Sequence, residues 1–586
     1  MLAPARPDVA PAPPDRTRFV LGGSGLLGFA LGALFVDWHV IVETGQVIAG
    51  IVQYPPDNPF FLYHVKLWTI LNQGAAALLR AGVSEIVISV LVSGLLGVLS
   101  FQALAIVIYA LSRDVALALG APFVIFLSGA TNFGVVYPIS LLATQHTYGV
   151  VGLGWVVLVA GLFGADRPKA AGLLLGAAPA VHPSLGVFLG LLIGLTALLD
   201  WPATWKAFRP GLGWFVAGCG VTLVSLGVHW ALLPEIAPLD RAESTRYLNA
   251  FVGFWDAHRA PVDFARVGVT INVVVVALAA YWLRRAATLS SGQRFLLRFV
   301  LVTGLVSQLL GLLSHLPPST LPPTLLVLMP SRLLNINVLI APALLVGLLG
   351  RRGSATNVAL TAITMALLFF WGRSLVWLFF EPGASLTVRK IGAAPFFAAA
   401  LGGFALVAWI ARRQGFGVVR AATVALMAAA AGLSFLIALE RSRVERDWLL
   451  RDRTNERVFG LASREPGFLL TGGDLHLIQL RTRRPVLLDA GGLDALPYTL
   501  EAAPATNRIL RDVYGVDLFN PPEEARGAGR VPLGRNRAVW EGYGLGRWRE
   551  IAQTYGVTQV MTPGEWQLQL PIIAAGQGIV LYTIPR

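Results

Sequence analysis

The sequence predicts a polytopic α-helical membrane bundle followed by a C-terminal soluble α/β domain. Hydrophobic residues make up 55% of the 586 residues, charged residues only 13%, and the mean hydropathy is +0.66. Soluble domains contain about 25% charged residues, so most of this chain is expected in lipid. Apolar stretches recur from Phe19 to Leu439, and the connections between them alternate between Arg-rich and Arg-poor.

The apolar stretches predict about thirteen membrane spans, because about 20 apolar residues cross the hydrocarbon core and fewer suffice beside a shielding neighbour. The predicted spans are residues 19–36, 86–111, 115–127, 150–163, 170–181, 185–199, 212–233, 267–283, 299–313, 333–349, 358–371, 391–410 and 421–439. This count takes the two short stretches around His182-Pro183 as two crossings.

The basic connections orient the predicted helices. They contain Arg113, Arg167, Lys169, Lys206, Arg209, Arg284, Arg285, Arg294, Arg298, Arg351, Arg352, Arg412, Arg413 and Arg420. The positive-inside rule then predicts a cytoplasmic N-terminus and an external C-terminal region in an inner (plasma) membrane. The net charge of +14 is explained in this way, so nucleic-acid binding is not expected.

The chain divides into three parts by composition. Residues 1–18 are rich in Pro, Ala and Arg and are expected to be a disordered cytoplasmic tail, with a cleaved signal peptide as the alternative. Residues 19–439 form the membrane part, with long external loops at 38–85, 234–266 and 315–332. Within the first loop, residues 60–79 are expected to form an amphipathic helix that lies along the membrane interface.

Residues 440–586 have the composition of a soluble domain of roughly 145 residues. Residues 468–470, 486–488 and 579–582 are predicted strands, and 507–514 and 548–555 are predicted helices ended by Gly515 and Gly556. Helices alternating with strands indicate a small α/β layer domain. The predicted orientation of the helices places this domain in the periplasm. The single cysteine, Cys219, excludes an intrachain disulfide and a cysteine metal cluster.

Asp37 is the first acidic residue on the expected outer side, directly after the first span, and Glu43 is the next. An inverting sugar transfer needs a base to take a proton from the acceptor hydroxyl, and a carboxylate at the membrane edge is well placed for this. The alternative is that Asp37 only ends the helix at the interface. Glu43 is the candidate to position the acceptor or a divalent cation.

Four outer cations break the orienting pattern: Lys66, Arg259, Arg332 and Arg373. A departing lipid phosphate requires positive charge at this surface, and Arg332 is the first choice as its ligand. The alternative is that these side chains extend to the lipid headgroups. His182 is a candidate for binding sugar hydroxyls, with structural hydrogen bonding as the alternative.

On this architecture and the position of Asp37, the chain resembles the GT-C superfamily of integral membrane glycosyltransferases. The resemblance implies transfer of a sugar from a polyprenyl-phosphate donor to a lipid or cell-envelope glycan or protein acceptor on the outer face, with Asp37 as the catalytic base. The paired-acid form of the family's motif is absent, since no acid adjoins Asp37. A multi-span transporter or flippase, or a non-catalytic GT-C-like protein, is the alternative.

Overall fold

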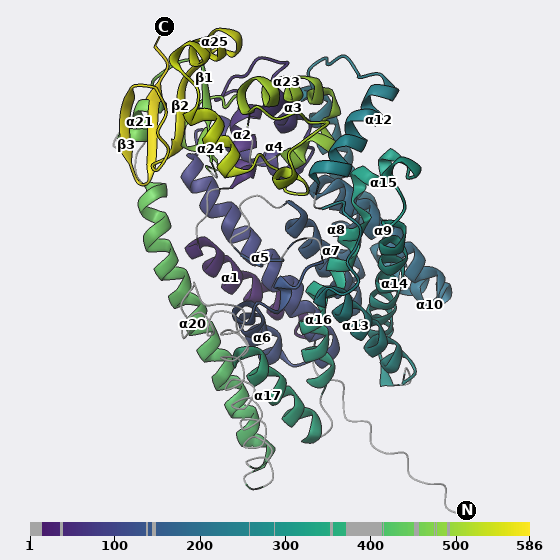
Figure 1. Ribbon diagram of the computed structural model, residues 1–586. Helices are drawn as coiled ribbons and strands as arrows, with labels where there is room; N and C mark the ends of the chain where they lie inside the picture. The colour runs from purple at the N-terminus through teal and green to yellow at the C-terminus, as the bar shows by residue number, and fades with distance from the viewer. Residues whose placement is uncertain are drawn as a thin grey trace, which may run out of the picture.

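Long apolar helices form a bundle, and a small mixed sheet with its own helices lies at one end of it (Figure 1). The computed structural model describes residues 15–35, 39–135, 137, 139–142, 148–256, 258–285, 288–351, 355–370, 409, 413, 415–450, 456–473, 475, 477–488 and 493–585. Asp37, Arg373 and nearly all of the predicted span 391–410 lie outside these residues.

Every predicted span within the described residues coincides with a helix. These helices are α1 (Thr17–Phe35), α5 (Glu85–Ser112), α6 (Val115–Ser128), α7 (Tyr148–Gly164), α8 (Pro168–Val181), α9 (Pro183–Leu198), α11 (Leu212–Leu232), α13 (Val267–Leu283), α14 (Ser291–Leu313), α16 (Leu334–Leu349), α17 (Ala355–Phe370) and α20 (Phe416–Leu450). Among the described residues, six helical segments are both long and apolar enough to cross a membrane, fewer than the thirteen spans predicted, since several of the remaining apolar helices have only 10–17 residues.

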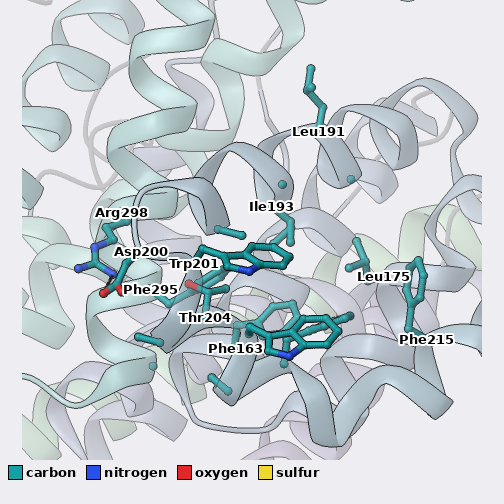
Figure 2. Close-up of a pocket in the computed structure, with 18 of the residues that line it drawn as sticks. Phe163, Leu175, Leu191, Ile193, Asp200, Trp201, Thr204, Phe215, Phe295 and Arg298 are labelled. Atoms are coloured by element: carbon teal, nitrogen blue, oxygen red, sulfur yellow. Dashed lines mark hydrogen bonds and ion pairs between the residues drawn. The ribbon is translucent and has the colours of Figure 1, made fainter.

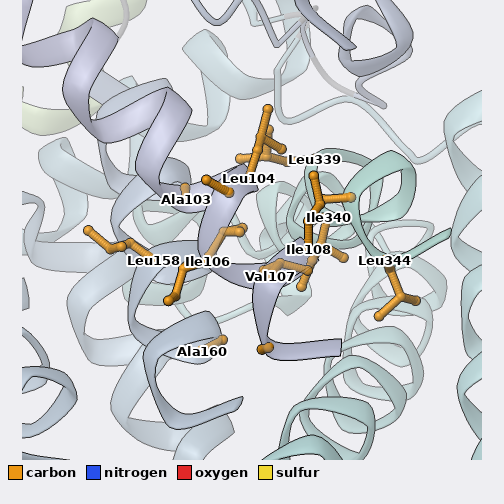
Figure 3. Close-up of a cluster of buried hydrophobic side chains, with 14 of the residues drawn as sticks. Ala103, Leu104, Ile106, Val107, Ile108, Leu158, Ala160, Leu339, Ile340 and Leu344 are labelled. Carbon is orange, nitrogen blue, oxygen red and sulfur yellow. The ribbon is translucent and has the colours of Figure 1, made fainter. Parts of the chain in front are cut away.

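Helix α5 is the centre of the bundle. All its residues from Ala103 to Ser112 are buried, and they pack between α7 and α16 (Figure 3). Its N-terminal half crosses α1 at glycines: a Cβ at Gly97 would meet the carbonyl oxygen of Gly28, and a Cβ at Gly32 would meet that of Ser93. Small residues allow helices in lipid to approach this closely.

Several of the predicted basic connections, in the part of the chain that the structure describes, meet at the end of the bundle opposite the sheet. Arg113 forms an ion pair with Asp166 at 3.2 Å, and Asp166 accepts a hydrogen bond from the backbone N–H of Gly292. Arg420 forms an ion pair with Asp114 at 2.9 Å. We call this end of the bundle the basic end. Helix α5 has 28 residues and is therefore about 42 Å long, from its first residue at the sheet end to Arg113 at the basic end.

The loops at the sheet end contain short helices. These are α2 (Val40–Ala49), α3 (Pro59–Lys66), α4 (Ile70–Arg80), α12 (Arg241–Ala250) with the π-helical turn Phe251–Trp255, and α15 (Pro323–Leu328). The predicted interfacial stretch 60–79 is therefore two helices, α3 and α4. They are separated because the Thr69 side chain caps α4 by accepting a hydrogen bond from the backbone N–H of Leu71.

The C-terminal sheet has the strand order β1-β2-β4-β3. Its strands are β1 (Phe468–Thr471), β2 (Val557–Pro563), β3 (Ile572–Gly576) and β4 (Ile579–Thr583), with β1 parallel to β2 and the other pairs antiparallel. Its helices are α21 (Arg457–Ala462), α22 (Ile478–Thr482), α23 (Ala503–Tyr514), α24 (Leu533–Glu541) and α25 (Leu545–Tyr555).

The structure confirms the predicted strands 468–470 and 579–582 and both predicted helices, which end at Gly515 and Gly556 with φ of 62° and 69°. The strand predicted at 486–488 is wrong: only Val486 pairs, in an isolated bridge to Leu469. Helix α20 continues to Leu450, past the predicted boundary at residue 440, and runs along the bundle to the sheet (Figure 1).

The C-terminal domain shares its core with α12 and the π-helical turn that follows it. Tyr247, Phe251 and Trp255 pack with its buried residues, and the Trp255 indole N–H donates to the Leu518 carbonyl at 2.8 Å. The domain also contacts the start of α5, where the Arg483 guanidinium binds both oxygens of Glu85 at 2.7 and 2.9 Å. These contacts hold the domain against the bundle.

We predict that Gly97→Val destabilises the protein by about 1–3 kcal/mol, because the added side chain forces α1 away from α5. Gly22→Val is the matched control, since a Cβ at Gly22 meets nothing within 4 Å. Thermal unfolding in detergent measures both changes. Equal midpoints for the two variants would contradict the close crossing.

Candidate functional site

A cavity of about 610 Å³ lies where the bundle meets the C-terminal domain. It is formed by parts of the chain that are far apart in sequence: α3 and the turn after it, the start of α7, the α8–α9 junction, the end of α11, the segments around Tyr137, Arg259 and Arg332, and the C-terminal domain. Its lining residues include Tyr63, Lys66, Trp68, Tyr137, Tyr148, His182, Leu226, His229, Trp230, His258, Arg259, Met329, Arg332 and Tyr498.

The cavity brings together four of the predicted site residues: Lys66, His182, Arg259 and Arg332. No carboxylate is among its lining residues in the described part of the chain. Three cations around an interior without lining acids favour an anionic ligand.

Two of the cations are held by carboxylates behind the cavity wall. Lys66 forms an ion pair with Glu501 of the C-terminal domain at 2.6 Å. Arg259 forms a buried ion pair with Asp256, and its Nε–H donates to the Leu326 carbonyl at 2.7 Å. These pairs fix the two side chains in place and offset part of their charge.

Arg332 contacts a phenol of the C-terminal domain. It stands in the 3-10 turn Pro330–Leu333, and its guanidinium donates to the Tyr498 hydroxyl at 3.0 Å. The ring of Tyr498 in turn lies 5.3 Å from the guanidinium carbon of Arg259. One aromatic residue of the C-terminal domain therefore contacts two cavity arginines.

The positive charge of Arg332 acts on its neighbours. Burial, together with the smaller effect of the Arg332 charge, lowers the pKa of His182 to about 3. Burial raises the pKa of Tyr137 above its usual value, while Arg332 opposes this rise. Both residues line the cavity, so Arg332 contributes to the electrostatic potential inside it.

His182 has a structural role in addition to lining the cavity. Its backbone N–H donates to Ala178 at the end of α8, and its Nδ1 accepts from the Leu185 N–H at 3.4 Å at the start of α9. It therefore joins the two short helices and is neutral at pH 7. The structure thus supports hydrogen bonding within the fold for this residue.

Lys66 is positioned by the way α3 is anchored. Asn58 caps α3 by accepting from Phe60 at 2.9 Å, and its amide donates to the Leu487 carbonyl of the C-terminal domain at 3.1 Å. On the opposite side, His64 Nδ1 lies 2.9 Å from the Thr44 hydroxyl on α2. The helix is held at both its beginning and its end.

Glu43 does not line the cavity. It lies on α2 and is 4% exposed, and its backbone carbonyl accepts a hydrogen bond from the Gln479 amide at 3.0 Å. The structure therefore places Glu43 inside the packing that supports α3. Asp37 and Arg373, the other predicted site residues, lie outside the described residues.

Sequence reasoning missed Tyr498, which is 166 residues from Arg332 and has no local motif. It also missed His229, whose ring stacks on Trp68 at 6.2 Å. Trp68 also lines the cavity, and its indole N–H donates to the Ser225 hydroxyl on α11 at 3.0 Å. These aromatic residues give the cavity flat apolar walls.

In the described residues, no group of three or more His, Cys, Asp or Glu could hold a metal ion. No protein-family model matches the chain, and no curated protein matches it. The function is therefore inferred from the geometry of the cavity.

We predict that His64→Gln weakens the pH dependence of stability. Burial lowers the pKa of His64 to about 3, whereas an unfolded histidine titrates near 6.5. Between these values unfolding takes up a proton, so the free energy of unfolding falls by about 1.4 kcal/mol per pH unit on acidification below 6.5. Thermal unfolding midpoints at pH 7.5 and pH 5 measure this loss of stability on acidification. The difference between the two midpoints should be smaller in His64→Gln than in the wild type.

Thr44→Ala is the control, because it removes the hydrogen-bond partner of His64 but keeps the imidazole. It should lower the midpoint at both pH values and leave the difference between them close to wild type. If His64→Gln shows the same difference between its midpoints at pH 7.5 and pH 5 as the wild type, the buried imidazole does not govern the acid sensitivity.

Proposed function

We propose that this protein is a membrane glycosyltransferase that transfers a sugar from a polyprenyl-phosphate donor to a lipid or cell-envelope glycan or protein acceptor. The cavity beside the C-terminal domain is the proposed site, on the outer face of an inner membrane. The observation that carries the proposal is the convergence of Lys66, Arg259 and Arg332 on one cavity. A phosphate leaving group requires such positive charge.

The wall formed by α11 supports a lipid-linked donor. Leu226, His229 and Trp230 of this helix line the cavity. The same helix has only two buried residues, Gly218 and Ser225, so most of its surface is available to lipid. A donor phosphate held at Arg332 would leave its polyprenyl chain beside this apolar face.

The C-terminal domain supports the acceptor side of the proposal. It contributes Pro497 and Tyr498 to the cavity lining, and Glu501 holds Lys66. Tyrosine combines an apolar ring with a hydroxyl, a pairing that suits contact with a sugar. We propose that this domain recognises the acceptor while the bundle binds the donor lipid.

The side of the membrane on which we place the cavity is inferred from the distribution of arginines. The cavity lies at the end of the bundle opposite the ion pairs of Arg113 and Arg420. By the positive-inside rule these arginines face the cytoplasm, which assigns the cavity to the outer face.

Asp37 is the proposed catalytic base. It lies in the chain between Phe35, the last residue of α1, and His39, which caps α2. Helix α2 supports α3 and its Lys66 through the Thr44–His64 contact. The base would accept the proton of the acceptor hydroxyl while the lipid phosphate departs at Arg332.

We expect Asp37→Asn to lower sugar transfer by at least about 100-fold, because an amide cannot accept the acceptor proton. Membranes supplied with a radiolabelled polyprenyl-phosphate sugar provide the assay, with equal expression verified. Asp57→Asn, an exposed acid in the same loop, is the control and should retain activity. Undiminished transfer by Asp37→Asn would exclude it as the base.

We expect Arg332→Gln to reduce kcat/KM by about 10- to 100-fold, the range for losing a hydrogen bond to a charged group. Arg241→Gln, an exposed arginine at the start of α12, should behave as wild type. A lipid-flipping assay in liposomes tests the alternative of a flippase. Flipping without any sugar transfer would replace the proposed activity.

A further inference from the structure

We propose that a second, apolar groove at the basic end binds an anionic phospholipid from the leaflet on that side. The groove has a volume of about 480 Å³ and lies between α8, α9, α14 and the short helix α10 (Trp201–Phe208). We call it the α9–α10 groove. No described residue lines both this groove and the cavity of Arg332, so it is a separate site.

One wall of the groove is smooth because α9 presents glycines to it. Gly186, Gly190 and Gly194 recur every four residues and all line the groove. A Cβ at Gly190 or Gly194 would meet nothing within 4 Å. The space beside these two glycines is therefore open rather than filled by a neighbouring helix.

The groove is polar at one end and apolar at the other. Asp200 and Arg298 lie at one end, and Leu175 and Phe215 lie at the opposite end (Figure 2). Arg298 forms an ion pair with Asp200 at 2.7 Å. This polarity matches a lipid with its headgroup beside the arginine and an acyl chain along the glycine wall.

The polar end carries an excess of positive charge. Arg294 also lines the groove there, so two guanidinium groups stand beside the single carboxylate of Asp200. Lys206 and Arg209 lie on and just after α10, which adds further cations to this region. A negatively charged headgroup complements this arrangement, whereas a zwitterionic one does so less well.

Helix α10 has the character of an interfacial helix. None of its residues is buried, and Trp201 is 53% exposed. The rings of Trp201 and Trp205 stack with centroids 5.6 Å apart, and both line the groove. Tryptophans are enriched at headgroup depth, which places the polar end of the groove at the membrane surface.

The experiment is lipid binding to the purified full-length protein, measured by native mass spectrometry with palmitoyl-oleoyl phosphatidylglycerol and phosphatidylcholine. We expect phosphatidylglycerol to bind more tightly than phosphatidylcholine. Gly190→Leu should abolish this binding by filling the groove. Arg294→Gln should weaken binding of phosphatidylglycerol about fivefold, as expected for one arginine beside an anionic lipid.

Gly22→Leu on α1 is the matched control, because its Cβ also meets open space but lies outside the groove. It should bind phosphatidylglycerol as wild type does. Unchanged binding by Gly190→Leu, or equal affinity for the two phospholipids, would overturn the proposal. So would displacement of phosphatidylglycerol by an equimolar polyprenyl phosphate, which would assign the groove to the donor chain.

If Gly190→Leu fails to fold, judged by its thermal unfolding, Arg294→Gln still tests the site, because it changes only a half-buried side chain at the polar end. Wild-type affinity in that variant would overturn the role of the arginine. The outcome is independent of sugar transfer, since the groove shares no residue with the proposed catalytic cavity.

Discussion

The attachment of the C-terminal domain to the sheet end of the bundle is the constraint on which the site depends. Glu85, at the start of α5, is 3% exposed and accepts two hydrogen bonds from Arg483 and one from Gln46. A buried carboxylate requires such partners, because an unpaired charge there costs several kcal/mol. The ion pair therefore fixes the domain to the same helix that organises the bundle.

The same attachment assembles the cavity. Asn58 and Tyr54, between α2 and α3, hydrogen-bond to Leu487 and Gln479 of the domain, which holds α3 and Lys66 beside it. Tyr498 then reaches Arg332 from the other side. The domain therefore contributes to the cavity through Tyr498 and also holds α3 in place beside it.

The two sites occupy opposite ends of the α8–α9 helix pair. His182 joins these helices at the cavity, and Asp200 follows α9 at the groove. The proposed catalytic cavity is aromatic and cationic, whereas the groove is apolar with charge at one end only.

The sequence determined the helices and the strands 468–470 and 579–582, because hydropathy and glycine stops are local signals. It also identified Lys66, His182, Arg259 and Arg332, which the structure places around one cavity. Only the tertiary structure decided that Tyr498 joins them, that Glu43 is buried beside Gln479, and that residues 486–488 form a single bridge. These outcomes depend on contacts between distant segments, which no residue pattern within either segment specifies.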